Sequence, residues 1–157
     1  MSHAAPSTAT LCMAMNEQQT IRAIFAGGHT VAVVGLSPKA WRESFGVSRA
    51  MQAAGWRIIP VNPVVAERGE TILGEKAYAT LADAALHEKI DLVNVFRNAD
   101  DVPPVADEAI AIDAPALWLQ MGIRHDEAAE RARAAGLKVV QDRCLKVEWM
   151  MRDRSSP

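Results

Sequence analysis

Hydroxyl and basic side chains gather in the segment that follows the first apolar run of the chain. The run ends at Gly35, and Ser37, Lys39, Arg42 and Ser44 follow it. Serine hydroxyls and the free N–H groups ahead of a helix donate hydrogen bonds to phosphate oxygens, while Lys and Arg add positive charge. Glycine permits a tight turn where a side chain would block a ligand. The segment therefore suits a phosphorylated ligand, and an ordinary solvent-exposed loop is the competing interpretation.

Polar or aromatic residues also end two later apolar runs. Asn62 follows one run and can hydrogen-bond a base or a ribose without repelling an additional phosphate. At the end of the other, Phe96 can stack on a base and Arg97 can bind a phosphate or a carboxylate. The alternative for this arginine is an ion pair with Asp100 or Asp101.

The standard nucleotide-binding motifs are absent from the segment after Gly35. It is not GxGxxG, because Ser37 stands where the second glycine belongs, and it is not GxxxxGK[ST]. An NAD site usually has Asp or Glu at the end of the second strand, where this chain has Asn62. The neighbouring Pro60 and Pro63 equally suit the end of an edge strand. An NAD(P)-binding oxidoreductase or redox sensor is therefore an alternative, but not the favoured one.

A fifth apolar run, near residues 116–120, carries further candidates. We expect Trp118 to belong to the core, and Gln120 and Gly122 to border a pocket at the strand end. His125 could act in catalysis, but a single histidine at a helix start is more often a neighbour of the cap. The sequence offers no obvious acid–base pair, so we expect no catalytic residue.

The cysteines and histidines do not form a metal-binding pattern. Cys12 and Cys144 are far apart, and the 4 histidines have no spacing typical of a zinc site. Arg143 could lower the pKa of Cys144 and favour a mixed disulfide with a thiol ligand. The simpler reading, a small and partly buried Cys144, is preferred.

Length and composition limit the function classes. The chain has 157 residues, of which 50% are hydrophobic, and carries 17 basic against 19 acidic residues for a formal charge of −2. A nearly neutral chain is unlike a protein that binds nucleic acid through a basic surface. Its apolar runs are shorter than the roughly 20 residues of a membrane helix. Residues 1–15 lack the features of a secretory signal, so we expect a cytoplasmic protein with a disordered tail there.

Strand-like and helix-like periods alternate along the rest of the chain. Such alternation predicts an α/β fold of Rossmann-like type, a doubly wound parallel sheet of about five to six strands in the order 3-2-1-4-5-6, with helices on both faces. Ligands bind such sheets at the carboxyl ends of the strands. The expected strands are residues 30–35, 57–62, 78–80, 91–96, 116–120 and 137–141; the expected helices are 16–25, 47–54, 80–88, one beginning at 100 or 101, and one beginning at 126; the expected loops include 36–45 and 67–76.

Several short segments together resemble a known family, the small stand-alone CoA-binding proteins. The segments are 32–37 (AVVGLS), 44–47 (SFGV), 59–63 (IPVNP), 72–75 (ILGE), 95–97 (VFR), 118–123 (WLQMGI) and 142–144 (DRC). The family has a single Rossmann-like domain that is similar to the CoA-binding domain of the succinyl-CoA synthetase α subunit. The resemblance extends over about residues 21–149, which places the domain at 16–150 between tails 1–15 and 151–157.

The resemblance implies that the ligand is coenzyme A (CoA) or an acyl-CoA. By motif position, the phosphates would be held by Gly35, Ser37, Lys39, Arg42, Ser44 and Gly46; the adenosine would be bordered by Val61, Asn62 and Pro63; and the other side would be closed by Phe96 and Arg97. The chain is too short to hold the phosphohistidine domain of the synthetase, so the resemblance implies a ligand without a reaction. A third possibility is an interaction module that binds no ligand and regulates an unknown protein partner.

Overall fold

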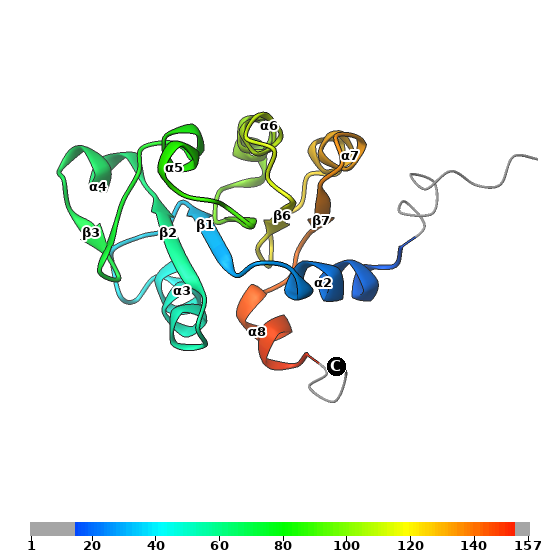
Figure 1. Ribbon diagram of the computed structural model, residues 1–157, viewed down its shortest axis with the longest axis horizontal. Coiled ribbons are helices and arrows are strands. Elements are labelled where there is room, and N and C mark those ends of the chain that lie inside the picture. Colours follow the sequence, from blue (N-terminus) through cyan, green and yellow to red (C-terminus); the bar gives the residue numbers. More distant parts are fainter. Residues whose placement is uncertain (1–14, 153–157) are drawn as a thin grey trace, which may run out of the picture.

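The computed structural model describes residues 15–152, in which helices and strands alternate (Figure 1). The helices are α2 (Glu17–Ala26), α3 (Glu43–Ala53), α4 (Pro63–Glu67), α5 (Leu81–His87), the 3-10 turn η1 (Ala99–Asp101), α6 (Val102–Ala111), α7 (Asp126–Ala134) and α8 (Leu145–Met150). The strands are β1 (Thr30–Val34), β2 (Arg57–Val61), β3 (Thr71–Ile72), β4 (Glu75–Lys76), β5 (Leu92–Val95), β6 (Ala116–Leu119) and β7 (Lys138–Val140).

Five of the strands form one parallel sheet in the order β2-β1-β5-β6-β7. This confirms the α/β doubly wound fold and the order of these five strands. The predicted third strand, residues 78–80, is reduced to a single parallel bridge between Tyr78 and Val61 beside β2. The chain crosses from β2 back to β5 on the far side of β1, so the strand order reverses between β1 and β5. Ligand sites of such sheets lie at this reversal.

Helices cover both faces of the sheet, as the continuous apolar strands require. In Figure 1, α5, α6 and α7 lie above the sheet, and α3 and α8 lie below it. Buried residues divide in the same way. One core cluster joins α5, α6 and α7 to alternate strand residues such as Ala32 and Val93. The other cluster joins α2, α3 and α8 to the strand residues that point to the opposite face of the sheet, such as Val33 and Leu92.

The predicted helix starts agree with local capping. Asn16 and Gln19 form a reciprocal capping box at α2, in which the Gln19 N–H donates to Asn16 Oδ1 at 2.8 Å. The Thr80 hydroxyl accepts from the Asp83 N–H at 3.0 Å at the start of α5. His125 is the N-cap of α7, and its Nδ1 accepts from the Ala128 N–H at 3.0 Å. This capping role supports the structural interpretation of His125 over the catalytic one.

Two predicted loops contain regular structure. The prediction of a loop over residues 67–76 is wrong, because this segment contains the antiparallel strand pair β3–β4. Its connection, Leu73–Gly74, has φ values of 55° and 77°, typical of a tight hairpin turn, but Leu73 lacks the usual Asn or Asp signal. The expected loop 36–45 is too long, because α3 begins at Glu43.

Short helices near the strand ends were not predicted. Helix α4 follows β2 because Asn62 accepts from two N–H groups of the first turn and Pro63 occupies the first helical position. Helix α8 has no side-chain cap to signal its start. Within residues 15–152, none of the helices combines the length and the apolar composition needed to cross a membrane. The predicted tails lie largely outside the described residues, which exclude 1–14 and 153–157.

Candidate functional site

Two hollows open at the carboxyl edge of the sheet, on either side of the end of β1. The first hollow has a volume of about 630 Å³ and lies between the loop after β1, the end of β5 and the end of β6. The second has a volume of about 530 Å³ and lies between the end of β2, α4 and α6. They share Gly35, Ser37, Arg97 and Asp101. The two hollows therefore meet at the reversal of strand order.

Most of the site residues predicted from the sequence line these hollows. They are Gly35, Ser37, Lys39, Arg42, Ser44, Phe96 and Arg97 in the first, and Gly35, Ser37, Val61, Asn62, Pro63 and Arg97 in the second. Gly46 lines neither hollow. It lies within α3, and a Cβ atom added there would meet nothing within 4 Å. The fold thus gathers the predicted set, apart from Gly46, in one place.

Gly35 allows the ends of β1 and β5 to approach each other. Its φ is 87°, and its N–H donates to the Val61 carbonyl oxygen at 3.0 Å. A Cβ atom at this position would collide with the carbonyl oxygen of Phe96. The Phe96 N–H in turn donates to the Val34 carbonyl oxygen at 2.9 Å. Any side chain at position 35 would both force these ends apart and fill the junction of the hollows.

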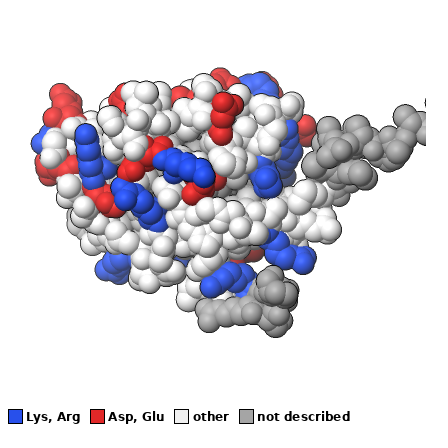
Figure 2. All heavy atoms as spheres, in the orientation of Figure 1, with Lys and Arg blue, Asp and Glu red and all other residues white. Residues whose placement is uncertain are grey.

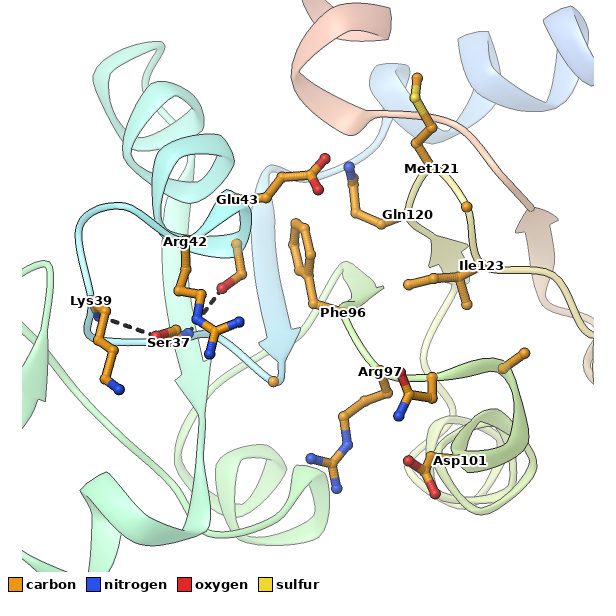
Figure 3. A pocket seen from close by; sticks show the side chains of 15 residues that line it. Ser37, Lys39, Arg42, Glu43, Phe96, Arg97, Asp101, Gln120, Met121 and Ile123 are labelled. Atoms are coloured by element: carbon orange, nitrogen blue, oxygen red, sulfur yellow. Dashed lines mark hydrogen bonds between the residues drawn. The ribbon is translucent and has the colours of Figure 1, made fainter.

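Hydrogen bonds accepted by two serine hydroxyls shape the loop after Gly35 (Figure 3). The Ser37 N–H donates to Ser44 Oγ at 3.0 Å, and the Lys39 N–H donates to Ser37 Oγ at 3.1 Å. These bonds hold the loop against the first turn of α3. Both hydroxyls still have a hydrogen to donate, so they can serve a ligand in the first hollow.

The N-terminus of α3 faces the first hollow without a side-chain cap. Its N-cap residue, Arg42, makes no capping hydrogen bond. Within the described residues, the N–H groups of Glu43 and Ser44 have no protein acceptor. Unbonded N–H groups and the helix dipole together attract anions. An anionic group in the first hollow would therefore meet oriented donors as well as basic side chains.

Three basic side chains surround the junction of the hollows. Lys39, Arg42 and Arg97 are exposed, and none of them forms an ion pair with a described residue. In Figure 3, the Arg42 and Arg97 side chains project from opposite sides toward the same space. The alternative for Arg97, an ion pair with Asp100 or Asp101, is thus not formed. Elsewhere on the visible face, basic and acidic residues are interspersed (Figure 2).

Asn62 has a bracing role that the sequence did not indicate. Its Oδ1 accepts from the N–H groups of Val64 and Val65 at 3.0 and 3.1 Å, and its Nδ2 donates to the Leu36 carbonyl oxygen at 2.9 Å. The amide therefore joins the end of β2, α4 and the loop after β1. Beyond it, the second hollow is lined by apolar groups of Val61, Pro63 and Pro104.

The comparison with protein families decides the identity of this fold. A family model described as a CoA binding domain matches residues 29–150. The chain belongs to this family. The uncharacterized protein YneT of Bacillus subtilis (strain 168) is 42% identical over 127 residues, which cover 81% of this chain and 90% of YneT. The sequence resemblance to stand-alone CoA-binding proteins is therefore confirmed.

Solved structures have the same architecture as this CoA-binding domain. A protein from Thermus thermophilus is 38% identical, with a TM-score of 0.78, over 87% of this chain and 98% of its own. A hypothetical protein from Pyrococcus horikoshii OT3 is 29% identical, with a TM-score of 0.77, over 96% and 97%. The dinucleotide-forming acetyl-coenzyme A synthetase 1 of Ca. Korarchaeum cryptofilum shares the fold at 20% identity and a TM-score of 0.59, over 71% of this chain and 25% of that enzyme.

In the CoA-binding domain, the first hollow is also lined by residues that follow β6 and by the first turn of α3. Gln120 and Gly122 border this hollow, as predicted, and are joined there by Glu43, Met121 and Ile123, which the sequence analysis did not single out. The apolar run that ends before Gln120 was the sequence feature that predicted a strand end at this position. Trp118 is fully buried, and its indole N–H donates to the Arg143 carbonyl oxygen at 2.8 Å.

Cys144 is a buried free thiol of the CoA-binding domain. The guanidinium of the adjacent Arg143 bonds to the carboxylates of Glu17 and Glu148, and the hydrogen bond to Glu17 raises the pKa of Arg143. Cys144 lines neither hollow. These contacts support the preferred structural interpretation of the thiol. Among residues 15–152, His, Cys, Asp and Glu side chains form no cluster that could hold a metal ion.

Proposed function

We propose that this protein binds CoA or an acyl-CoA across the two hollows, and we assign it no reaction of its own. One observation carries the proposal: the hollows meet where three unpaired basic side chains and the uncapped N-terminus of α3 surround Gly35. CoA has a pyrophosphate and a ribose 3′-phosphate, so it needs several cationic and N–H donors close together. Membership of the CoA-binding domain family supports the same ligand.

In this proposal, the phosphates lie at the junction of the hollows. The Ser37 and Ser44 hydroxyls and the side chains of Lys39, Arg42 and Arg97 donate to phosphate oxygens. A glycine at position 35 leaves room for the pyrophosphate close to the backbone.

The adenosine occupies the second hollow. The apolar surfaces of Val61, Pro63 and Pro104 line it and suit the faces of an adenine ring. Phe96 closes the opposite side of the junction, in the first hollow. Gly46 has no part in binding, because it lines neither hollow.

An NAD(P) ligand fits this site less well. The β2 end has Asn62 in place of the carboxylate that binds the ribose hydroxyls of NAD, and the side chain of Asn62 is engaged in bracing the loop.

A thermal-shift titration tests the proposal. The full-length protein is melted with CoA, dephospho-CoA, NADH or NADPH, because a ligand that binds only the folded state raises Tm. CoA should give the largest increase, and dephospho-CoA a smaller one, since it lacks the 3′-phosphate. A larger increase with NADPH than with CoA would replace the proposed ligand. No increase with any of the four would favour the interaction module.

A further inference from the structure

The first hollow divides into a basic half and a half without basic side chains. Lys39, Arg42 and Arg97 lie on the side nearest the junction with the second hollow. The other half lies beyond Phe96, between the start of α3 and the end of β6, and we call it the distal half (Figure 3). It is lined by Glu43, Phe96, Gln120, Met121 and Ile123. Glu43 is the acidic side chain of this set.

A ligand whose phosphates sit at the junction can place its remaining parts in the two hollows. If the adenosine takes the second hollow, the pantetheine arm and its thioester extend into the distal half. Apolar groups of Phe96, Met121 and Ile123 suit the alkyl part of such an arm. We propose that the distal half holds the acyl group of an acyl-CoA and selects an uncharged acyl group. This inference rests on the proposed function.

Gln120 supplies an unused donor at the base of the distal half. The residue is 1% exposed, and its Oε1 accepts from the Leu145 N–H at 2.9 Å. Its Nε2 has no hydrogen-bond partner among residues 15–152. Figure 3 shows the amide nitrogen directed toward the side of the hollow that carries Glu43. A buried donor normally has an acceptor, and a carbonyl oxygen of the pantetheine arm or the thioester would be one.

Further buried polar groups lie behind Gln120 on the same face of the sheet. Asn94 is paired in register with Trp118, so Gln120 lies two residues nearer the carboxyl edge on the same side. In the described part of the chain, the side-chain nitrogen and oxygen of Asn94 have no hydrogen-bond partner, and the same holds for the Ser48 hydroxyl of α3. Neither residue lines the hollow, so these groups are polar exceptions within a face of the sheet whose core is otherwise apolar.

Glu43 sets the charge preference of the distal half. Its carboxylate is exposed in the first turn of α3, and it forms no ion pair with a described residue. Figure 3 shows the side chain reaching over the hollow toward Gln120. The free carboxylate of a succinyl thioester would meet the Glu43 carboxylate, and no basic residue is among those that line the distal half. An acetyl or other neutral acyl group would not be repelled.

Calorimetric titration of the full-length protein with acetyl-CoA and succinyl-CoA tests the inference. The wild type should bind acetyl-CoA about fivefold more tightly than succinyl-CoA. Glu43→Gln keeps the size of the side chain and should bring this ratio close to one. Glu108→Gln is the matched control, because Glu108 is a carboxylate that lines the second hollow. Whatever its effect on overall affinity, the control should leave the ratio at its wild-type value.

A second variant tests which end of the ligand lies beside Gln120. Gln120→Glu keeps an oxygen for the Leu145 N–H but removes the donor, and its melting temperature without ligand reports whether the fold is intact. It should weaken acetyl-CoA binding about fivefold. Binding of adenosine 3′,5′-bisphosphate, which has no pantetheine arm, should change less than twofold.

The outcomes distinguish a failure of the proposed function from a failure of the acyl site alone. Failure of wild-type protein to bind CoA or either acyl-CoA overturns the proposed function, and the inference with it. Binding with equal affinity for the two acyl-CoAs, or a ratio that changes in Glu108→Gln instead of Glu43→Gln, overturns the acyl site alone. Equal weakening of acetyl-CoA and adenosine 3′,5′-bisphosphate by Gln120→Glu would place the adenosine in the distal half and also overturn it.

Discussion

The side-chain amide of Asn62, at the end of β2, donates to the carbonyl oxygen of Leu36, in the loop after β1, at 2.9 Å. The same side chain caps α4 through Val64 and Val65. One residue therefore joins the phosphate-binding loop of the proposed site to the wall of the second hollow. The contact links two neighbouring strand ends through a side chain, so local backbone geometry alone does not determine it.

Two substitutions of Asn62 should separate the contributions of its two contacts to the stability of the fold. Asn62→Ala loses the cap and the bond to Leu36, and should lower the free energy of unfolding by about 2 kcal/mol. Asn62→Asp keeps an acceptor for the cap but loses the donor, so it should cost about 1 kcal/mol. Urea denaturation measures both values. No loss in Asn62→Asp would show that the contact with Leu36 contributes nothing, and equal losses in the two variants would show the same for the cap of α4.

Gly35→Ala should be strongly destabilising. The positive φ and the collision with the Phe96 carbonyl oxygen together should cost at least about 2 kcal/mol of unfolding free energy. Gly46→Ala is the matched control, because Gly46 lies in a helix and an added Cβ meets nothing there. The control should stabilise the protein by about 0.5–1 kcal/mol. A neutral effect of Gly35→Ala in urea denaturation would contradict the geometry of the junction.

Arg97→Ala should weaken CoA binding at least about tenfold, because a charge-assisted hydrogen bond to a phosphate is lost. Since Arg97 forms no ion pair with a residue of the described range 15–152, the melting temperature without ligand should hardly change. Arg68→Ala removes an exposed arginine that lines neither hollow and should leave the affinity unaltered. Titration calorimetry with CoA compares the two variants, and similar affinities would argue against a phosphate contact of Arg97.

Cys144 should react slowly with a maleimide in the native protein, because its side chain is buried. The measurement uses a Cys12→Ser variant, so that mass spectrometry reports the remaining thiol alone. Labelling should become rapid in guanidinium chloride and should not depend directly on bound CoA, since Cys144 lies outside both hollows. Fast native labelling that CoA blocks would instead revive the mixed-disulfide hypothesis.

The strand ends of this fold were predictable because apolar runs identify buried parallel strands. Each run stops at a residue that is polar or permits a turn, such as Gly35, Asn62 or Gln120. Parallel strands bring their carboxyl ends to one edge of the sheet, so these residues had to lie near one another. Their types then indicated a phosphorylated ligand.

The individual contacts were not predictable in the same way. Ser37 and Ser44 were both expected to face a phosphate, but they also bond to each other. Gly46 appeared to belong to the loop because the exact start of α3 depends on tertiary packing and has no side-chain cap. Glu43 and Met121 are distant in the sequence and have no shared motif. They line the same hollow only because the start of α3 and the segment after β6 border the same edge of the sheet.

The sheet protects both of its edges against pairing with another chain. On the β2 side, Pro60 has no N–H to offer, and its carbonyl oxygen already accepts from the Tyr78 N–H at 2.9 Å. On the opposite side, β7 has three residues, begins with the exposed Lys138, and is packed against α2. Within residues 15–152, a second copy therefore finds no long strand edge of the sheet to extend, so self-association through this part of the chain would use helices or side chains.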